Sequence, residues 1–282
     1  MQLPDVSRPQ RGDFPNRFLR MTPTRSAVCG RFGRPTPRTM GAWLFYVSLG
    51  QPFRIKSDTG PARSCSIALV EPWTVHQVST EDSDIAMLMI EPESVDGDRI
   101  FRPWFATPSR MAGTHLSMLR AFSSPPAEWI DFDLQFFGSA LPERALDPRI
   151  RKVVDMIYER NDSDLSIDMC AAHVCLSPSR LMHLFQDQLG TSFRRFRGWR
   201  RARSLLHKMG KSPALVQVAL DMGYSDSTHL SKSTRSWYGY TPTTMFRGRS
   251  NRSIACGKSA NPTSRPTTGR MRPRAIRSRM LR

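Results

Sequence analysis

The C-terminal half of this chain contains one short pattern twice, and that repeat constrains the fold more than any other feature of the 282 residues. In the first copy, Ser166 is a candidate N-cap for a short helix that continues to Val174, and Ser177-Pro178 begins a second helix that Gly190 ends. Cys175 lies in the turn between the two helices. A short helix, a tight turn and a helix with a polar outward face are typical of a helix-turn-helix unit.

The second copy follows at a nearly constant distance along the chain. The turn residues Cys175 and Gly223 are 48 residues apart, and the offset becomes 49 after the turns, which one additional residue in the second turn explains. The pairs at the longer offset are Ser177 with Asp226, Leu181 with Leu230, and Gly190 with Gly239. Because chance produces two such units far less often than one, we predict an all-α domain with two helix-turn-helix units over residues 145–247.

Two further amphipathic helices are predicted. One begins at Asp147-Pro148, before the first unit, and carries an apolar stripe formed by Ile150, Val153, Val154, Ile157 and Tyr158. The other joins the units over residues 192–208, with an apolar seam formed by Phe193, Phe196, Trp199, Ala202 and Leu205. At 1.5 Å per residue this long spacer spans about 25 Å. With some bending of the DNA, it would place two recognition helices in successive major grooves about 34 Å apart.

The polar side of the spacer helix is rich in arginine. Such a face is either simply solvated or positioned to contact DNA phosphates, and the flanking recognition helices favour phosphate contacts. The expected phosphate-binding residues are Arg194, Arg195, Arg197, Arg200 and, in the second recognition helix, Arg235.

These residues resemble the DNA-binding domain of the AraC/XylS family of bacterial transcription regulators, over residues 146–246. The most similar stretches are LSPSRLMHLFQDQLGTSFRRF at 176–196 and ALDMGYSDSTHLSKSTRSWYGYTP at 219–242. The signature A-x-x-x-G-[FY]-x-D is present as Ala219, Gly223, Tyr224 and Asp226, and the closing Gly-x-[ST]-Pro as Gly239, Thr241 and Pro242.

The resemblance implies that one monomer inserts both recognition helices into adjacent major grooves. Carried over by position, the base-reading residues are Ser179, Arg180 and His183 in the first unit, and Ser227, Thr228, His229 and Lys232 in the second. His183 and Lys232 stand where the family commonly has arginine, which can bridge guanine O6 and N7. Thr234 replaces a core phenylalanine that would correspond to Phe185. If nothing fills that space, the loss costs about 3–5 kcal/mol, so we expect a less stable second unit.

Residues 41–144 are expected to form a second domain. Apolar runs at 42–49, 66–70, 73–78 and 85–90, separated by turn residues, indicate a small antiparallel sandwich or barrel, and the pattern becomes helical after Pro108 and at 129–137. The family resemblance implies a cupin-like barrel here that senses a small molecule and supports dimerisation. The expected fold class is therefore α+β, with a cupin-like small β-barrel and trailing helices before the double helix-turn-helix domain.

The charge is distributed unevenly. Lys and Arg number 42 against 24 Asp and Glu, a net charge of +18. Residues 1–40 and 248–282 are basic and poor in large apolar residues, so both are expected to be disordered tails. The first segment also resembles a transit peptide, and Met40 is an alternative start. The excess charge indicates a polyanionic partner, and double-stranded DNA fits better than a membrane surface.

No catalytic motif, metal site or cofactor site is predicted. His76 and His115 stand alone in the first domain, where we expect His76 to be structural, and the five cysteines contain no C-x-x-C pair. No P-loop, G-x-S-x-G or H-E-x-x-H motif is present. One enzyme class remains as an alternative, a DNA-repair methyl acceptor with a reactive cysteine, although Cys170 and Cys175 fall in the first unit where burial is expected.

We therefore expect a sequence-specific transcription regulator rather than an enzyme. A non-specific architectural DNA-binding protein that uses the basic tails is the other alternative. The expected partners are double-stranded DNA, a second copy bound through the N-terminal domain, RNA polymerase and a small-molecule effector, with no membrane. The expected location is the cytoplasm, with reduced thiols and association with the nucleoid.

Overall fold

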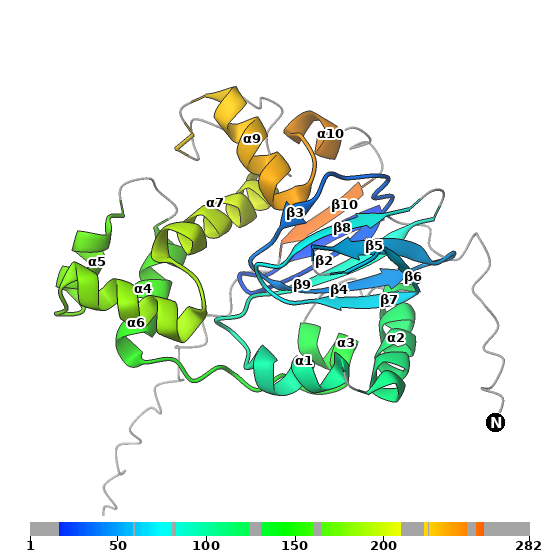
Figure 1. The fold of residues 1–282 in the computed structure, drawn as a ribbon, viewed down its shortest axis with the longest axis horizontal. Helices are drawn as coiled ribbons and strands as arrows, with labels where there is room; N and C mark the ends of the chain where they lie inside the picture. The colour runs from blue at the N-terminus through cyan, green and yellow to red at the C-terminus, as the bar shows by residue number, and fades with distance from the viewer. Residues whose placement is uncertain are drawn as a thin grey trace, which may run out of the picture.

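The chain folds into a β domain with three helices followed by a helical domain (Figure 1). The computed structural model describes residues 17–58, 60–80, 83–105, 107–123, 131–160, 165–209, 223–224, 226–246 and 252–256. The strands are β1 (Arg17–Met21), β2 (Arg25–Gly30), β3 (Arg38–Thr39), β4 (Trp43–Ser48), β5 (Phe53–Ser57), β6 (Arg63–Cys65), β7 (Ile67–Val70), β8 (Val75–Ser79), β9 (Ile85–Ile90) and β10 (Arg252–Cys256). The helices are α1 (Gly97–Phe105), α2 (Pro108–Ser123), α3 (Phe132–Phe137), α4 (Pro148–Glu159), α5 (Ile167–His173), α6 (Pro178–Leu189), α7 (Phe193–Met209), α9 (Ser227–Tyr238) and α10 (Pro242–Phe246).

The β domain is built from two separate sheets. Six strands form one sheet in the order β10-β1-β2-β9-β4-β7, and four form the other in the order β3-β8-β5-β6. Among the described strands, every pairing is antiparallel except that of β1 with β10. The predicted mixture of β-structure and helices is confirmed, but the cupin-like barrel is not, because the sheets are stacked on each other without closing.

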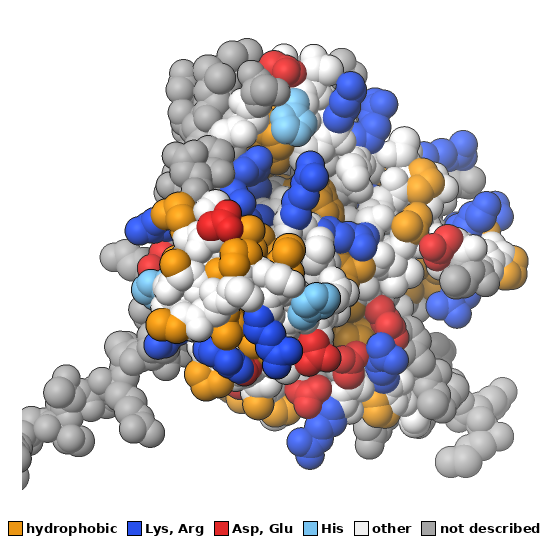
Figure 2. Space-filling view, turned by 60° about the vertical axis from the view of Figure 1, so that its left-hand side comes forward, with side chains coloured by type: hydrophobic (Ala, Val, Ile, Leu, Met, Phe, Trp, Pro, Cys, Tyr) orange, Lys and Arg blue, Asp and Glu red, His pale blue; other side chains and the backbone are white. Residues whose placement is uncertain are grey.

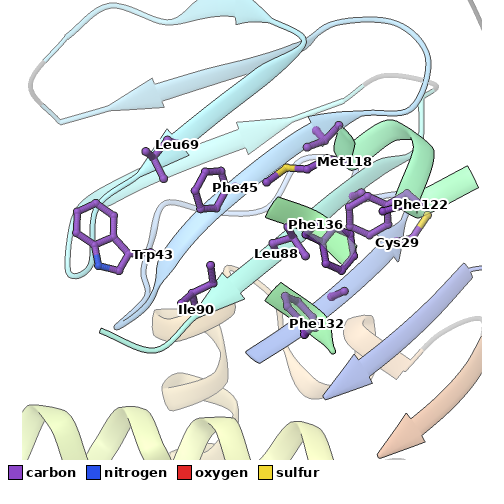
Figure 3. Packing of buried hydrophobic residues seen from close by; sticks show 14 of the residues in the cluster. Cys29, Trp43, Phe45, Leu69, Leu88, Ile90, Met118, Phe122, Phe132 and Phe136 are labelled. Atoms are coloured by element: carbon purple, nitrogen blue, oxygen red, sulfur yellow. The ribbon is translucent and has the colours of Figure 1, made fainter. Parts of the chain in front are cut away.

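The larger sheet is buried on both faces. Along β4, Trp43, Phe45 and Val47 pack toward α1, α2 and α3, whereas Leu44 and Tyr46 pack toward the smaller sheet. Figure 3 shows Phe45 and its neighbours on β9 meeting aromatic side chains of α2 and α3. This double burial explains why β4 and β9 are continuous apolar runs in the sequence rather than alternating ones.

The prediction of a disordered tail over residues 1–40 is wrong for residues 17–40. β2 pairs with β9 in the interior of the larger sheet, and Ala27 is fully buried there. Arg25 is also buried, and its guanidinium holds the Asp133 carboxylate at 2.8 and 3.0 Å. The basic composition of this segment gave no indication of strand β2, because Asp133, which neutralises the Arg25 charge, lies far away in the sequence. In the predicted C-terminal tail, β10 pairs with β1; residues 1–16 and 257–282 lie outside the described part.

The helical domain contains both of the helices predicted to be recognition helices, and their offset is the predicted 49 residues. α6 and α9 have 12 residues each, and each ends at a glycine in the left-handed conformation, Gly190 at φ 66° and Gly239 at φ 77°. The predicted N-caps are confirmed, since the side chains of Ser177 and Asp226 accept hydrogen bonds from the third residue after each. The expected first helix of the second unit, with Ala219, lies outside the described residues.

The two turns share an unusual backbone conformation. Cys175 has φ 54° and the equivalent Gly223 has φ 67°. A residue with a Cβ atom in this region costs about 1–2 kcal/mol relative to a right-handed conformation, whereas glycine adopts it readily. The first unit therefore contains strain that the second avoids.

We expect Cys175→Gly to stabilise the protein by about 0.5–1 kcal/mol, since relief of strain exceeds the extra entropy that glycine has in the unfolded chain. Cys175→Val, with a branched Cβ, should destabilise it by about 1 kcal/mol or more. Denaturant unfolding of both variants beside the wild type measures these differences. Equal stability of the glycine and valine variants would show that the turn is not strained.

Candidate nucleic-acid interface

The first recognition helix, α6, separates its apolar and polar residues cleanly. Leu181, Phe185 and Leu189 are buried in the core of the helical domain. The three predicted base-reading residues Ser179, Arg180 and His183 are all exposed. The Ser177 cap fixes the start of the helix through a 3.2 Å hydrogen bond from the Arg180 amide, so the exposed residues lie in its first two turns.

The second recognition helix, α9, presents an equivalent surface. The four predicted residues Ser227, Thr228, His229 and Lys232 are all exposed. Asp226 caps the helix by accepting a 2.8 Å hydrogen bond from the His229 amide, and the His229 ring meets the Tyr224 ring edge-on at 5.2 Å. Both helices thus expose their N-terminal turns, the part of a recognition helix that contacts bases in this class of domain.

Thr234 occupies a buried position in α9, as the repeat predicted, but its polar group has a partner. The hydroxyl donates a 2.7 Å hydrogen bond to the Leu230 carbonyl, so no polar atom of this side chain is left unsatisfied. Aromatic packing comes from the next turn, where Trp237 and Tyr238 lie 5.7 and 6.0 Å from the Trp199 ring. In the second unit, the aromatic contact is therefore made one helical turn after Thr234, the position equivalent to Phe185 in the first unit.

The spacer helix α7 has the predicted length and a buried seam. Phe193, Phe196, Trp199, Ala202 and Leu205 are all buried. Of the predicted phosphate-binding residues, Arg194, Arg195 and Arg235 are exposed, and Arg197 is half-buried over the Phe193 ring. Lys and Arg side chains spread over the face that the helical domain presents in Figure 2.

Arg200 does not fit the predicted phosphate-binding role. It is buried, 3.6 Å from the Glu91 carboxylate and 4.0 Å from that of Glu93, and its guanidinium lies 3.6 Å from the centre of the Tyr158 ring. A guanidinium held between two carboxylates and an aromatic ring cannot reach a DNA phosphate in this structure. The assignment of Arg200 to the phosphate-binding set is therefore wrong for this conformation.

Arg200 belongs to a buried charge network between the two domains. Glu91, fully buried at the end of β9, forms a 2.6 Å ion pair with Arg203 Nε and accepts a 2.7 Å hydrogen bond from Trp199 Nε1. Arg203 Nη1 also donates to the Ser26 hydroxyl of β2 at 3.0 Å. These contacts fasten the middle of α7 to the larger sheet. We call Glu91, Glu93, Arg200 and Arg203 the interdomain network.

The Glu93 carboxyl is also buried in this network. Burial, together with the neighbouring Glu91 charge, raises its pKa to about 7. Tyr158 of α4 donates a 2.5 Å hydrogen bond to Glu93 Oε1, and Arg151 of the same helix donates to the Glu93 carbonyl at 3.4 Å. The network therefore joins the β domain to α4 as well as to α7.

Sequence reasoning missed this network, although a signal was present. Arg200 and Arg203 are four and seven residues after Phe196, so all three share one face of α7. That spacing places both arginines beside the apolar seam rather than on the opposite, solvated side. The carboxylate partners, however, are more than 100 residues away in the chain, and no local pattern points to them.

The cysteines of the first unit differ in exposure. Cys170 is buried, as expected, and burial raises the pKa of its thiol. Cys175 is exposed, contrary to the expectation. In the β domain, His76 is buried with its Nε2 2.8 Å from the Tyr46 hydroxyl and its Nδ1 2.9 Å from the Thr74 carbonyl, and burial lowers its pKa to about 3.

Comparison with known proteins agrees with this arrangement of helices. A family model described as "Helix-turn-helix domain" matches residues 170–248. The arabinose operon regulatory protein of Escherichia coli (strain K12) is 34% identical over 106 residues, and the match covers 36% of this chain and 36% of that protein. This domain belongs to the AraC/XylS family. The HTH-type transcriptional regulator ArgR of Pseudomonas aeruginosa is 29% identical over 98 residues, 34% of this chain and 29% of ArgR.

Similarity to curated AraC/XylS proteins thus spans about a third of their length. A structural match extends further, to ToxT from Vibrio cholerae, with a TM-score of 0.54 over 79% of this chain and 97% of ToxT. Sequence identity to ToxT is 11%, so the match shows a shared fold, a β domain followed by the helical domain.

The raised pKa of Glu93 makes a prediction about stability. Between the ordinary carboxyl value of 4.5 and about 7, the folded protein keeps a proton that the unfolded chain has lost, so stability should fall as pH rises through this range. In Glu93→Gln, which cannot titrate, this contribution is absent. Denaturant unfolding from pH 4.5 to 8 should show the wild type losing stability relative to the variant up to about pH 7, and then a constant difference. A difference independent of pH would contradict the prediction.

Proposed function

We propose that this chain is a sequence-specific DNA-binding transcription regulator in which each monomer places α6 and α9 in adjacent major grooves. The observation that carries the proposal is the pair of capped 12-residue helices at an offset of 49, each exposing its predicted base-reading residues. The AraC/XylS membership of the domain supports DNA binding and regulation. The exposed Arg194, Arg195 and Arg235 are proposed to contact phosphates.

The β domain is proposed as a sensor and dimerisation domain. Arg38 supports a ligand-binding role, because it is 2% exposed and donates to the Tyr46 hydroxyl, yet forms no ion pair with any carboxylate of the described residues. A buried, uncompensated cation favours a small anionic effector. ToxT has been solved bound to a butenoic acid derivative, which also carries a carboxylate. RNA polymerase and a second copy of the chain are proposed as further partners.

The alternative functions receive less support. Cys170, with its raised thiol pKa, lacks the activation that a methyl acceptor needs, and among the described residues no group of His, Cys, Asp and Glu is arranged to hold a metal. Within the described chain, no helix combines the length and apolarity needed to cross a bilayer. We propose a location in the cytoplasm with association to the nucleoid.

Footprinting tests the two-groove arrangement. On a duplex selected from a random pool, the full chain should protect two patches about one helical turn apart, because α7 separates the recognition helices by the length of a 17-residue helix. The same duplex with five base pairs inserted between the patches should bind much more weakly, since one half-site then faces the opposite side of the DNA. A single continuous patch that tolerates the insertion would contradict the proposal.

Thr228 and Lys232 provide the test of base reading. Thr228→Ala or Lys232→Ala should cost about 1–3 kcal/mol on the selected duplex and little on a scrambled one. Ser236→Ala, an exposed residue in the last turn of α9, is a matched control and should change neither. Titration of each variant on both duplexes measures the difference. Equal weakening on both would mean that α9 contacts the backbone rather than the bases.

A further inference from the structure

A cleft opens between the first half of α7 and the second recognition helix. Its volume is about 350 Å³, and its walls come from both helices and from the turn before α9. The lining residues are Ser192, Arg194, Arg195, Gly198, Arg201, Tyr224, His229, Ser233 and Trp237. His229 and Ser233 belong to α9, so the cleft adjoins the proposed base-reading surface.

Three arginines converge on this cleft without any acidic partner. Among the described residues, no carboxylate forms an ion pair with Arg194, Arg195 or Arg201. Arg201 instead lies over the Tyr224 ring at 5.6 Å, and Arg195 lies over the Trp73 ring at 4.9 Å. Converging guanidinium groups repel one another, and an anion bound between them would remove that repulsion.

The cleft lies on the side of α7 opposite the interdomain network. Arg194, Gly198 and Arg201 share one face of the helix, and Arg203 is about 180° from Arg194 around the helix axis. Gly198 lines the cleft opposite Trp237, and a Cβ atom there would lie 3.3 Å from the Trp237 ring, which is a tight contact. The glycine that lowers the intrinsic helix propensity of α7 therefore has a structural reason.

We propose that this cleft holds one phosphodiester of the DNA backbone, bound by Arg194 and Arg201, with Arg195 held at its edge by Trp73 of the β domain. The inference rests on the proposed DNA-binding function and adds two residues to it, Arg201 and Trp73. A DNA phosphate fits better than a free anion, because the cleft is open and adjoins α9, whose exposed N-terminal turns are the proposed base-reading surface. The hydroxyls of Ser192 and Ser233 supply additional donors for phosphate oxygens.

Trp73 links the β domain to this site. Its backbone is in the left-handed region at φ 67°, which is unusual for a bulky residue, and its amide donates a 2.7 Å hydrogen bond to the Met40 carbonyl. The indole ring lies 6.3 Å from the ring of Trp237 on α9 and contacts the cores of both domains. Part of the affinity for DNA would then depend on a side chain outside the helix-turn-helix domain.

Salt titrations test the phosphate contact. For Arg194→Ala and Arg201→Ala we expect the slope of log K against log salt to fall by about one ion, with about tenfold weaker binding at 0.1 M salt. If both residues hold the same phosphate, the double variant should lose little more than either single one. Arg99→Ala, an exposed arginine of α1, is the control and should leave the slope unchanged. Unchanged slopes for Arg194→Ala and Arg201→Ala would overturn the proposal, as would fully additive losses.

A second set of variants tests Trp73. Trp73→Leu should weaken binding by the same factor as Arg195→Ala, and the double variant should bind no more weakly than Arg195→Ala alone. Trp73→Phe, which keeps an aromatic face, should restore most of the affinity, and circular dichroism of each variant checks the fold. If Trp73→Leu and Arg195→Ala acted independently, Trp73 would have no role in the phosphate contact.

Both sets are measured on the selected and on a scrambled duplex, and inorganic phosphate is added as a competitor. Because phosphate contacts do not depend on sequence, the losses should appear on both duplexes alike. If the wild type bound both duplexes equally and the variants lost affinity as expected, the regulator function would be overturned but the cleft proposal would stand. If the wild type preferred the selected duplex and the variants lost no affinity, the cleft proposal would be overturned but the regulator function would stand. Binding of millimolar phosphate to the wild type but not to Arg201→Ala, without displacement of DNA, would show that the cleft takes free anions instead of the DNA backbone.

Discussion

The buried carboxylate of Glu91 is the point on which the arrangement of the two domains depends. It lies at the end of β9, in the middle of the larger sheet, and its two oxygens engage Arg203 and Trp199 of α7. A buried carboxylate without such partners would be strongly unfavourable, so the sheet and the spacer helix stabilise each other. Because α7 joins the two recognition helices, this contact fixes the part of the molecule that determines their separation.

α7 consequently has two arginine-bearing faces with different roles. Arg200 and Arg203 are neutralised inside the protein, whereas Arg194 and Arg201 face the cleft and keep their charge available. Composition alone treats all of them as one basic surface. The distinction follows from which face of the helix meets the carboxylates of the β domain, and it explains how a strongly basic helix can also be an interdomain contact.

The β domain also holds the end of the second recognition helix. The Thr36 amide and hydroxyl both donate to the Gly239 carbonyl, at 3.0 and 3.1 Å. A Cβ atom at Gly239 would lie 2.6 Å from the Thr36 carbonyl oxygen, so only glycine permits this approach. Together with the contacts of Trp73, these hydrogen bonds mean that both the spacer helix α7 and α9 pack against the β domain. A ligand that altered the β sandwich would therefore act on two positions of the DNA-binding domain.

The sequence by itself determined the helical domain, because its signals are local. Caps such as Ser177 and Asp226, terminal glycines and apolar spacing each act within about ten residues, and the repeat confirmed them against one another. The same is true of the runs that became β4, β7, β8 and β9. Strands β1, β2 and β10, the open sandwich and the burial of Arg200 were decided only by the tertiary structure. In each case the contact partner lies far away in the chain, as with Arg25 and Asp133 or Arg203 and Glu91. The sequence of a single segment does not indicate which distant charge or surface will cover it.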